Sequence, residues 1–247
     1  MRDIINAEVY RLKKSKLFWG IIIYVFIIFI AAYHIDLEGG AEGEKMISSA
    51  SQLFELQNGY ALFVSQIFFA AIRASQFISD YKSGYVKDVV GYGNNRFQFW
   101  LSKTLVYTLG NIIIYLAGFA AIILGGAVAG EGFGVFSQIP DNTIPVMLVS
   151  AIAVSAISFL LSAIIIAIPH EITLIFIIAA TNIFLQVAVI SEMFPKFVKY
   201  FPLTAFVGIN QENFSASTFF RAVGVLAYTV IISALIVKLT FCRKEIK

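Results

Sequence analysis

The chain has 247 residues, 59% of them hydrophobic, and a formal net charge of +3. Its mean hydropathy of +0.84 excludes a soluble domain of this length and indicates an integral membrane protein. The single cysteine, Cys242, has no partner for an intrachain disulfide or a cysteine-based metal site.

Residues 1–16, MRDIINAEVYRLKKSK, have the pattern of a helix at a membrane surface. Ile4, Ile5, Val9 and Leu12 fall within about 140° of one another on a helix, and the lysines lie toward the other side. We predict an interfacial helix here, with its basic residues near anionic lipid headgroups. The alternative is an ordinary basic flank that only orients the first span.

Six apolar runs are long enough to cross a bilayer as helices, because about 30 Å of hydrocarbon needs about 17–25 residues. They cover residues 17–33, 60–78, 104–129, 146–168, 172–190 and 219–241. The runs are continuously apolar, which favours helices over the alternating strands of a barrel. We therefore predict an all-α membrane protein, with residues 1–247 forming a single domain of six transmembrane helices.

Lysine and arginine are concentrated on one side of this arrangement. They lie in the N-terminal lead, in residues 79–103 and at the C-terminus, whereas the opposite loops contain Lys45, Lys196 and Lys199. The positive-inside rule then places both termini and the 79–103 loop in the cytoplasm.

The loop 79–103, SDYKSGYVKDVVGYGNNRFQFWLSK, is longer than a simple connection requires. Tyr81, Tyr85 and Val89 recur at every fourth position and would share one face of a short helix, with Ser79 as its cap and with Gly91 and Gly93 at its end. That face either docks on a partner protein or packs against the second and third spans.

Residues 192–218 precede the last run and combine aromatic residues with two prolines and two lysines. We predict an outer re-entrant hairpin, with a surface lid as the alternative.

Four polar residues lie within the apolar runs: Arg73, Asn111, Asn182 and Gln186. The amides either form hydrogen bonds between helices or line a transport pathway. Arg73 either snorkels or forms an ion pair, or has a role in transport.

The sequence lacks the motifs of membrane enzymes and of ATP-binding proteins. His34 and His170 fall on opposite sides of the predicted bilayer, and neither HExxH, GxSxG nor a phosphate-binding GxxxxGK[ST] occurs. We therefore expect no catalytic residue, no metal site and no cofactor in this chain.

Three segments resemble type 2 ABC exporter permeases: NAEVYRLKKSKLFW at the N-terminus, the whole 79–103 loop, and FPKFVKYFPLTAFVGI before the last run. The likeness extends over essentially the whole chain and is greatest to small permease subunits of lantibiotic immunity and bacitracin-type resistance. Asp80 stands where many members of that family have Glu.

The resemblance implies a permease subunit that exports a hydrophobic or amphipathic substrate, such as a peptide antibiotic, across the bacterial plasma membrane. Its partners would be two copies of a separate ATP-binding subunit, which holds ATP and Mg, a second permease that is identical or a sister chain, and membrane lipids, with no nucleic acid. The coupling residues implied are Asp80, Lys82, Gly84, Tyr85, Val86, Lys87, Asp88 and Val89. The alternative is a membrane scaffold or sensor whose basic loop binds lipid or a regulatory partner.

Overall fold

The computed structural model describes residues 1–34, 76–92, 95–128, 142–167 and 214–242, and all regular structure within these ranges is helical. The predicted all-α class is thus confirmed for the described part of the chain. The helices are α1 (Arg2–Lys14), α2 (Lys16–His34), α4 (Tyr85–Gly91), α5 (Arg96–Gly126), α6 (Thr143–Ala167) and α9 (Ala216–Thr240). Residues 76–82 form a further helical segment before α4.

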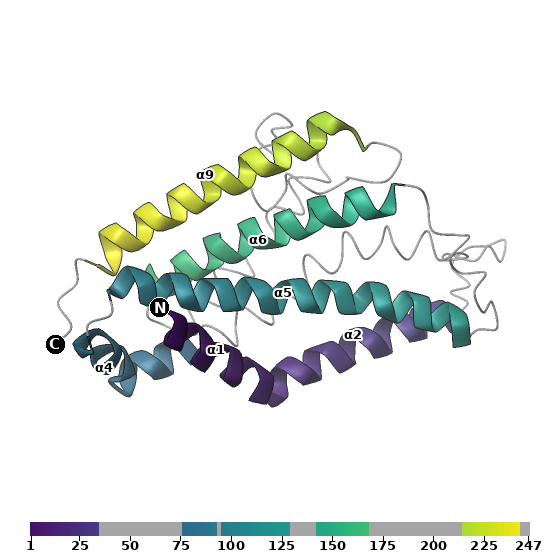
Figure 1. The fold of residues 1–247 in the computed structure, drawn as a ribbon. Helices are drawn as coiled ribbons and strands as arrows, with labels where there is room; N and C mark the ends of the chain where they lie inside the picture. Colours follow the sequence, from purple (N-terminus) through teal and green to yellow (C-terminus); the bar gives the residue numbers. More distant parts are fainter. Residues whose placement is uncertain (35–75, 93–94, 129–141, 168–213, 243–247) are drawn as a thin grey trace, which may run out of the picture.

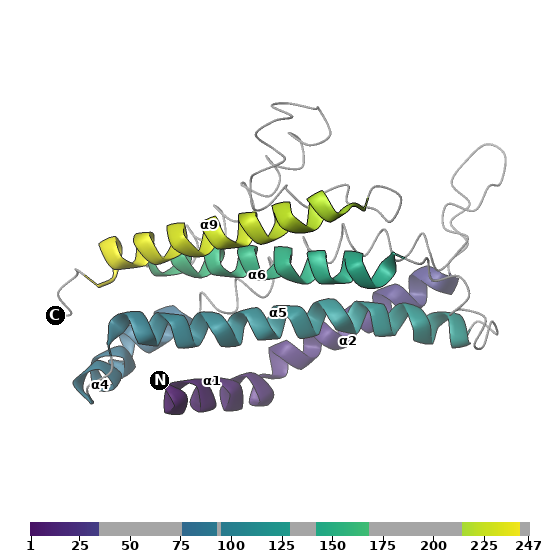
Figure 2. The same cartoon turned by 45° about the horizontal axis from the view of Figure 1, so that its top comes forward.

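α5 is the central helix of the bundle. α2 packs along one side of it and α6 along the other, and α9 packs on α6 (Figures 1 and 2). α1 packs against α5, and α4 lies at the end of the bundle where α5 begins (Figure 1).

Four of the predicted spans correspond to described helices. α5, α6 and α9 are each long and apolar enough to cross a membrane, and α2 adds a fourth candidate that is joined to α1 through a bend of 55°. The predicted span 172–190 and most of residues 60–78 and 192–218 lie outside the described residues. The count of six spans therefore stays a prediction.

α5 begins eight residues earlier than the predicted span 104–129, and its N-terminal cap explains the difference. The Asn95 side chain accepts a hydrogen bond from Phe97 N at 3.0 Å, and Gln98 Oε1 accepts one from Asn95 N at 3.4 Å. This capping box starts the helix in the polar part of the loop. With 31 residues, α5 is about 46 Å long and exceeds the hydrocarbon thickness of about 30 Å.

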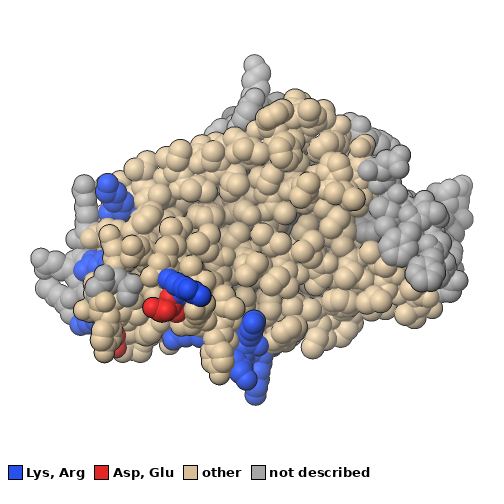
Figure 3. Space-filling view, in the orientation of Figure 1, with Lys and Arg blue, Asp and Glu red and all other residues tan. Residues whose placement is uncertain are grey.

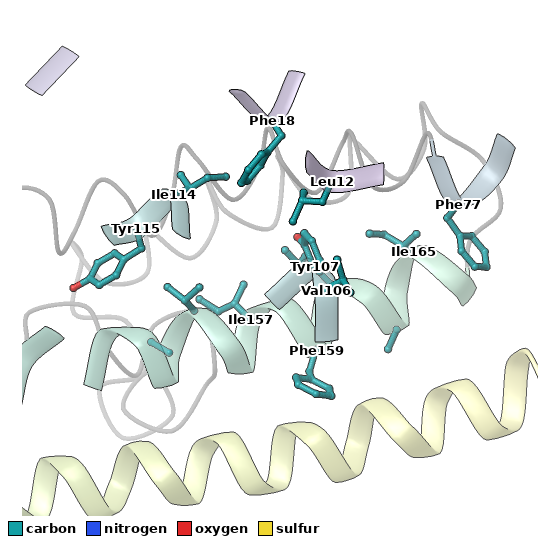
Figure 4. Close-up of a cluster of buried hydrophobic side chains, with 14 of the residues drawn as sticks. Leu12, Phe18, Phe77, Val106, Tyr107, Ile114, Tyr115, Ile157, Phe159 and Ile165 are labelled. Atoms are coloured by element: carbon teal, nitrogen blue, oxygen red, sulfur yellow. The ribbon is translucent and has the colours of Figure 1, made fainter. Parts of the chain in front are cut away.

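The core runs along the contact between α5 and α6 and extends to the N-terminal helices (Figure 4). Buried alanines of α6 let the two helices approach closely. Leu12 of α1 and Phe18 of α2 belong to the same cluster. The apolar stripe of α1 therefore packs on protein, and the predicted interfacial helix presents its polar side outward.

Charged side chains gather at one end of the visible face, where α1 and α4 lie (Figure 3). Large apolar side chains are exposed along α2 and α9, among them Ile23, Ile27, Ile231 and Leu235. Such faces suit contact with lipid or with another apolar helix.

Candidate functional site

The loop predicted to carry the coupling residues folds as two helical pieces joined by a tight turn. Ser79, Asp80 and Lys82 belong to the segment 76–82, and α4 begins at Tyr85. The prediction of one helix capped by Ser79 is therefore wrong. The break lies at Gly84, whose φ of 80° is in the left-handed region that favours glycine.

α4 has one face in the core and one face at the surface. Val86 and Val89 are buried, and the half-buried Tyr85 ring lies 6.2 Å from the ring of Phe99 on α5. The exposed residues of the turn and of α4 are Tyr81, Lys82, Ser83, Lys87, Asp88, Gly91 and Tyr92. The three residues predicted to share a face are thus not on one surface, since Tyr81 is exposed, Tyr85 is half-buried and Val89 is buried. The outward surface is instead polar and includes Tyr81 and Tyr92.

A network of four charged side chains lies beside α4, and we name it the charge cluster (Glu8, Arg11, Asp80 and Lys103). Lys103 Nζ donates to Glu8 Oε1 at 2.8 Å and to Asp80 Oδ2 at 2.6 Å. Arg11 Nη1 donates to both carboxylate oxygens of Asp80 at 3.0 Å and to Glu8 Oε1 at 3.3 Å. The cluster joins α1, the segment 76–82 and α5.

The cluster balances two carboxylates against two cations in a largely buried place. The side chains of Glu8, Asp80 and Lys103 are 1%, 9% and 12% exposed, whereas Arg11 is 42% exposed. Buried charges require partners of opposite sign because they have lost their hydration. Each carboxylate here has two such partners, so the cluster fixes the three segments relative to one another.

Tyr85 connects α4 to the charge cluster. The Arg11 guanidinium carbon lies 4.7 Å from the centre of the Tyr85 ring, a cation–π distance. Burial lowers the pKa of the Arg11 guanidinium, but the carboxylates of Asp80 and Glu8 outweigh it and hold that pKa above its ordinary value. Burial also raises the pKa of the Tyr85 hydroxyl. Arg11 is therefore always charged and Tyr85 is neutral at neutral pH.

A cavity lies between the segment 76–82, α5 and α6, with Lys103 in its wall. It is small, with a volume of about 30 Å³ for the centres of water molecules, and it is partly open to solvent. Three polar side chains of its lining form hydrogen bonds between α5 and α6. Trp100 Nε1 and Thr104 Oγ1 both donate to Ser162 Oγ, at 3.1 and 2.9 Å. These bonds tie α5 to α6 and leave the cavity a predominantly apolar wall.

The predicted polar residues of the spans are only partly described. Asn111 is buried, and its Nδ2 donates to Ser158 Oγ on α6 at 2.8 Å, so it forms a hydrogen bond between helices. Arg73, Asn182 and Gln186 lie outside the described residues, and a role for any of the four in a pathway stays a prediction.

The charge cluster has the chemistry of a structural ion-pair network that holds three segments together. In the described ranges no group of three or more His, Cys, Asp or Glu side chains is placed to hold a metal ion. Both carboxylates of the cluster bind lysine and arginine instead.

The amino-acid sequence matches the family described as ABC-2 family transporter protein over residues 4–179. This region is more than half of the chain and includes the charge cluster and α4. The chain belongs to the ABC-2 family of transporters. A comparison with curated proteins found no match.

Membership in the ABC-2 family makes the chain a permease subunit of an ABC transporter, a multi-pass membrane protein. The ATPase of such a transporter resides in separate ATP-binding subunits with which the permease associates. The predicted permease family is thus confirmed at the level of ABC-2, and the lantibiotic-immunity subtype stays a prediction.

Sequence reasoning counted Arg11 and Lys103 only as positive charges and did not single out Glu8 as a site residue. A signal for Glu8 was present, because it lies between Ile4 and Leu12 at four-residue spacing and so falls in the apolar stripe of α1. An acidic residue in such a stripe requires a buried cationic partner. Its partners, from more distant parts of the sequence, became evident only in the fold.

Proposed function

We propose that α4 is the element through which this ABC-2 permease receives the motion of its ATP-binding subunit. The observation that supports this is the break at Gly84, after which α4 begins as a short helix with an exposed polar face. Tyr85 of α4 contacts Arg11, so α4 remains connected to the bundle through the charge cluster.

Movement of α4 would reach the bundle by two routes. The Tyr85 ring lies beside Phe99 near the start of α5, and Val86 and Val89 are buried in the core, so a displacement of α4 would act on α5 through Phe99. Asp80 transmits the same displacement to α1 and α5 through Arg11 and Lys103. Closure of the ATP-binding subunits would then bias the permease between an inward-receptive and an outward-releasing arrangement.

The orientation, substrate and stoichiometry are further parts of the proposal. The end that carries α4 and the charge cluster faces the cytoplasm, where most lysines and arginines of the sequence are placed by the positive-inside rule. The transporter is an exporter of hydrophobic or amphipathic molecules, with peptide antibiotics as the substrate class. Two ATP-binding subunits serve a pair of permeases, either identical or sister chains.

Affinity purification of the tagged full chain in mild detergent tests the partnership. We expect an ATP-binding subunit to co-purify stoichiometrically, with ATPase activity that depends on this chain, and mass analysis to reveal whether a second permease is present. Recovery of the chain with a regulatory protein or with lipid alone would support the scaffold or sensor reading and contradict the coupling proposal.

Substitutions at Gly84 and in α4 test this proposal. Gly84→Pro cannot adopt a φ of 80°, and Tyr85→Ala removes the ring beneath Arg11. We expect both variants to insert normally but to lose substrate-stimulated ATPase activity of the complex. Gly91→Ala is the matched control, since Gly91 is exposed, has no left-handed φ and has open space around it. Full stimulation in the Gly84 and Tyr85 variants would exclude docking through α4.

Growth assays test the substrate class. Cells that express this permease with its ATP-binding subunit should tolerate several-fold higher concentrations of lantibiotics or bacitracin-type peptides than cells with the Gly84→Pro variant. Equal tolerance, with an active and assembled complex, would reject peptide antibiotics as substrates while leaving the coupling proposal intact.

A further inference from the structure

The end of α9 is joined to the start of α5 by a hydrogen bond. Arg96, the first residue of α5, donates from Nη1 to the carbonyl oxygen of Phe241 at 3.2 Å. Phe241 is the C-terminal cap of α9, and the last carbonyl groups of a helix have no partner within the helix. A cation at this end is also favoured by the helix dipole. Arg96 therefore holds the end of α9 beside the first turn of α5 (Figure 1).

The Phe241 ring makes a second connection, as part of a group that we name the aromatic cluster (Phe77, Phe99 and Phe241). Its centre lies 6.0 Å from that of the Phe77 ring and 6.5 Å from that of the Phe99 ring, and the last two centres are 6.4 Å apart. All three side chains are buried. Ring pairs at such distances attract each other beyond the effect of burying their apolar area. The aromatic cluster thus joins α9 to α5 and to the segment 76–82.

The aromatic cluster lies beside the residues that connect α4 to the bundle. The Tyr85 ring of α4 is 6.2 Å from the Phe99 ring. Lys103 Nζ, which belongs to the charge cluster, lies 5.1 Å from the centre of the same ring. Phe77 precedes Asp80 by three residues on one helical segment. Phe99 therefore contacts both α4 and the end of α9.

Along the rest of its length α9 packs on α6 (Figures 1 and 2). In the most apolar stretch of each long helix, 28% of α9 is buried, against 56% of α5 and 67% of α6. A helix with few buried residues is displaced at a lower free-energy cost than one in the centre of the core. A displacement at the last turn of α9 can therefore move this helix relative to α6.

We propose that Arg96 and Phe241 are positioning residues that transmit the movement of α4 to α9, so that the last membrane helix moves together with the start of α5. This inference rests on the proposed function of α4. A displacement of α4 reaches Phe99 through Tyr85 and then reaches the ring of Phe241. The Arg96 bond keeps the end of α9 at the start of α5 during this movement. α9 then shifts on α6, which changes the arrangement of the membrane helices.

Distances between spin labels test the proposal on the permease assembled with its ATP-binding subunits in lipid nanodiscs. In a Cys242→Ser background, one label is placed at Ile144→Cys on α6 and the second at Leu235→Cys on α9 or at Gly91→Cys on α4. All three labelled positions are exposed. Pulsed electron paramagnetic resonance measures each distance without nucleotide and with ATP trapped by vanadate. The α4 pair tests the proposed function, and the α9 pair tests this inference.

We expect ATP to change both distances by about 2–5 Å, the scale of helix shifts in switching proteins. Arg96→Met and Phe241→Leu should abolish the change in the α9 pair and keep that in the α4 pair, with the nucleotide-free distances unaltered because the fold is intact. Arg96→Lys retains a charged donor and should keep most of the change. Lys238→Met is the matched control, because it removes an exposed positive charge from the last turn of α9 and should leave both changes as they are.

A change in the α4 pair with none in the α9 pair of the unmodified protein would overturn this inference and leave the proposed function standing. An α9 change that persists in full in Arg96→Met and in Phe241→Leu would also overturn it, because α9 would then move by another route. An α4 pair that ATP leaves unchanged would refute the proposed function, and the inference with it.

Discussion

Asp80 accepts hydrogen bonds from two cations that belong to different helices, and Lys103 donates to two carboxylates that belong to different segments. In the charge cluster each cation therefore binds both carboxylates, and each carboxylate binds both cations. Removing one carboxylate leaves Arg11 and Lys103 to share the other, so the cluster keeps an excess positive charge in a largely buried place, which is destabilising.

Asp80→Asn keeps the shape of the side chain and removes its charge. We expect a loss of about 3 kcal/mol of stability, because Lys103 is left with Glu8 alone. The apparent melting temperature of the detergent-purified protein should fall by several degrees. Asp88→Asn is the same change at an exposed position of α4 and should have little effect. Equal melting temperatures for the two variants would show that the cluster does not stabilise the fold.

Ser158→Ala removes the acceptor of the Asn111 amide within the bundle. The expected cost is about 0.6–2 kcal/mol, the range of hydrogen bonds between transmembrane helices. The double variant Ser158→Ala, Asn111→Leu should lose less stability than the two single variants lose together, because it has no unpaired amide. Ser155→Ala is the control, because Ser155 Oγ donates to Ala151 O within its own helix. Unfolding in increasing dodecyl sulfate compares the unmodified protein with the four variants, and additive losses would argue against the Asn111–Ser158 bond.

At the scale of elements, apolar runs in the sequence predict where α2, α6 and α9 lie, because hydrocarbon demands continuous apolar length. The start of α5 was missed for the same reason, since Arg96, Gln98 and Lys103 interrupt the apolar pattern of its first turns. Asn95 followed three residues later by Gln98 is a sequence signal for the start of a helix, and it predicts that α5 begins at Arg96. The meeting of Glu8 with Lys103 was beyond such reasoning, because it is set by how α1 packs against α5.

Asn95→Ala should loosen the first turn of α5. Loss of the cap costs about 1 kcal/mol, so amide hydrogen exchange at the start of α5 should become about fivefold faster. Asn95→Ser retains a capping oxygen and should exchange at nearly the original rate. If both variants exchange alike, packing of Phe99 and Trp100 rather than the cap holds this end of α5.

At the scale of the whole molecule, the described helices account for four of the six predicted spans, and the single-domain description stays a prediction. The orientation of the chain in the membrane also stays a prediction, made from the distribution of lysine and arginine in the sequence. The cysteine that follows α9 offers a direct test of it.

Cys242 should react with membrane-impermeant maleimide only in inverted vesicles, where the proposed cytoplasmic side faces outward. Burial raises the pKa of its thiol, so labelling should accelerate as the pH rises from 7 toward 9 and more thiolate forms. In a Cys242→Ser background, Glu42→Cys, in a loop predicted on the other side and outside the described residues, should label only in right-side-out vesicles. Labelling of both positions from one side would contradict the predicted topology.

The charge cluster also sets an order of events during biosynthesis. Glu8 emerges from the ribosome 95 residues before its partner Lys103, a delay of about 5–20 s at ordinary elongation rates. Throughout that interval α1 cannot take its final place, because the carboxylate that it must bury has no lysine to meet. The first helix to be synthesised thus takes its final place only after the start of α5 has been made. A nascent chain stalled before Lys103 would present α1 to whatever chaperone or protease attends the membrane.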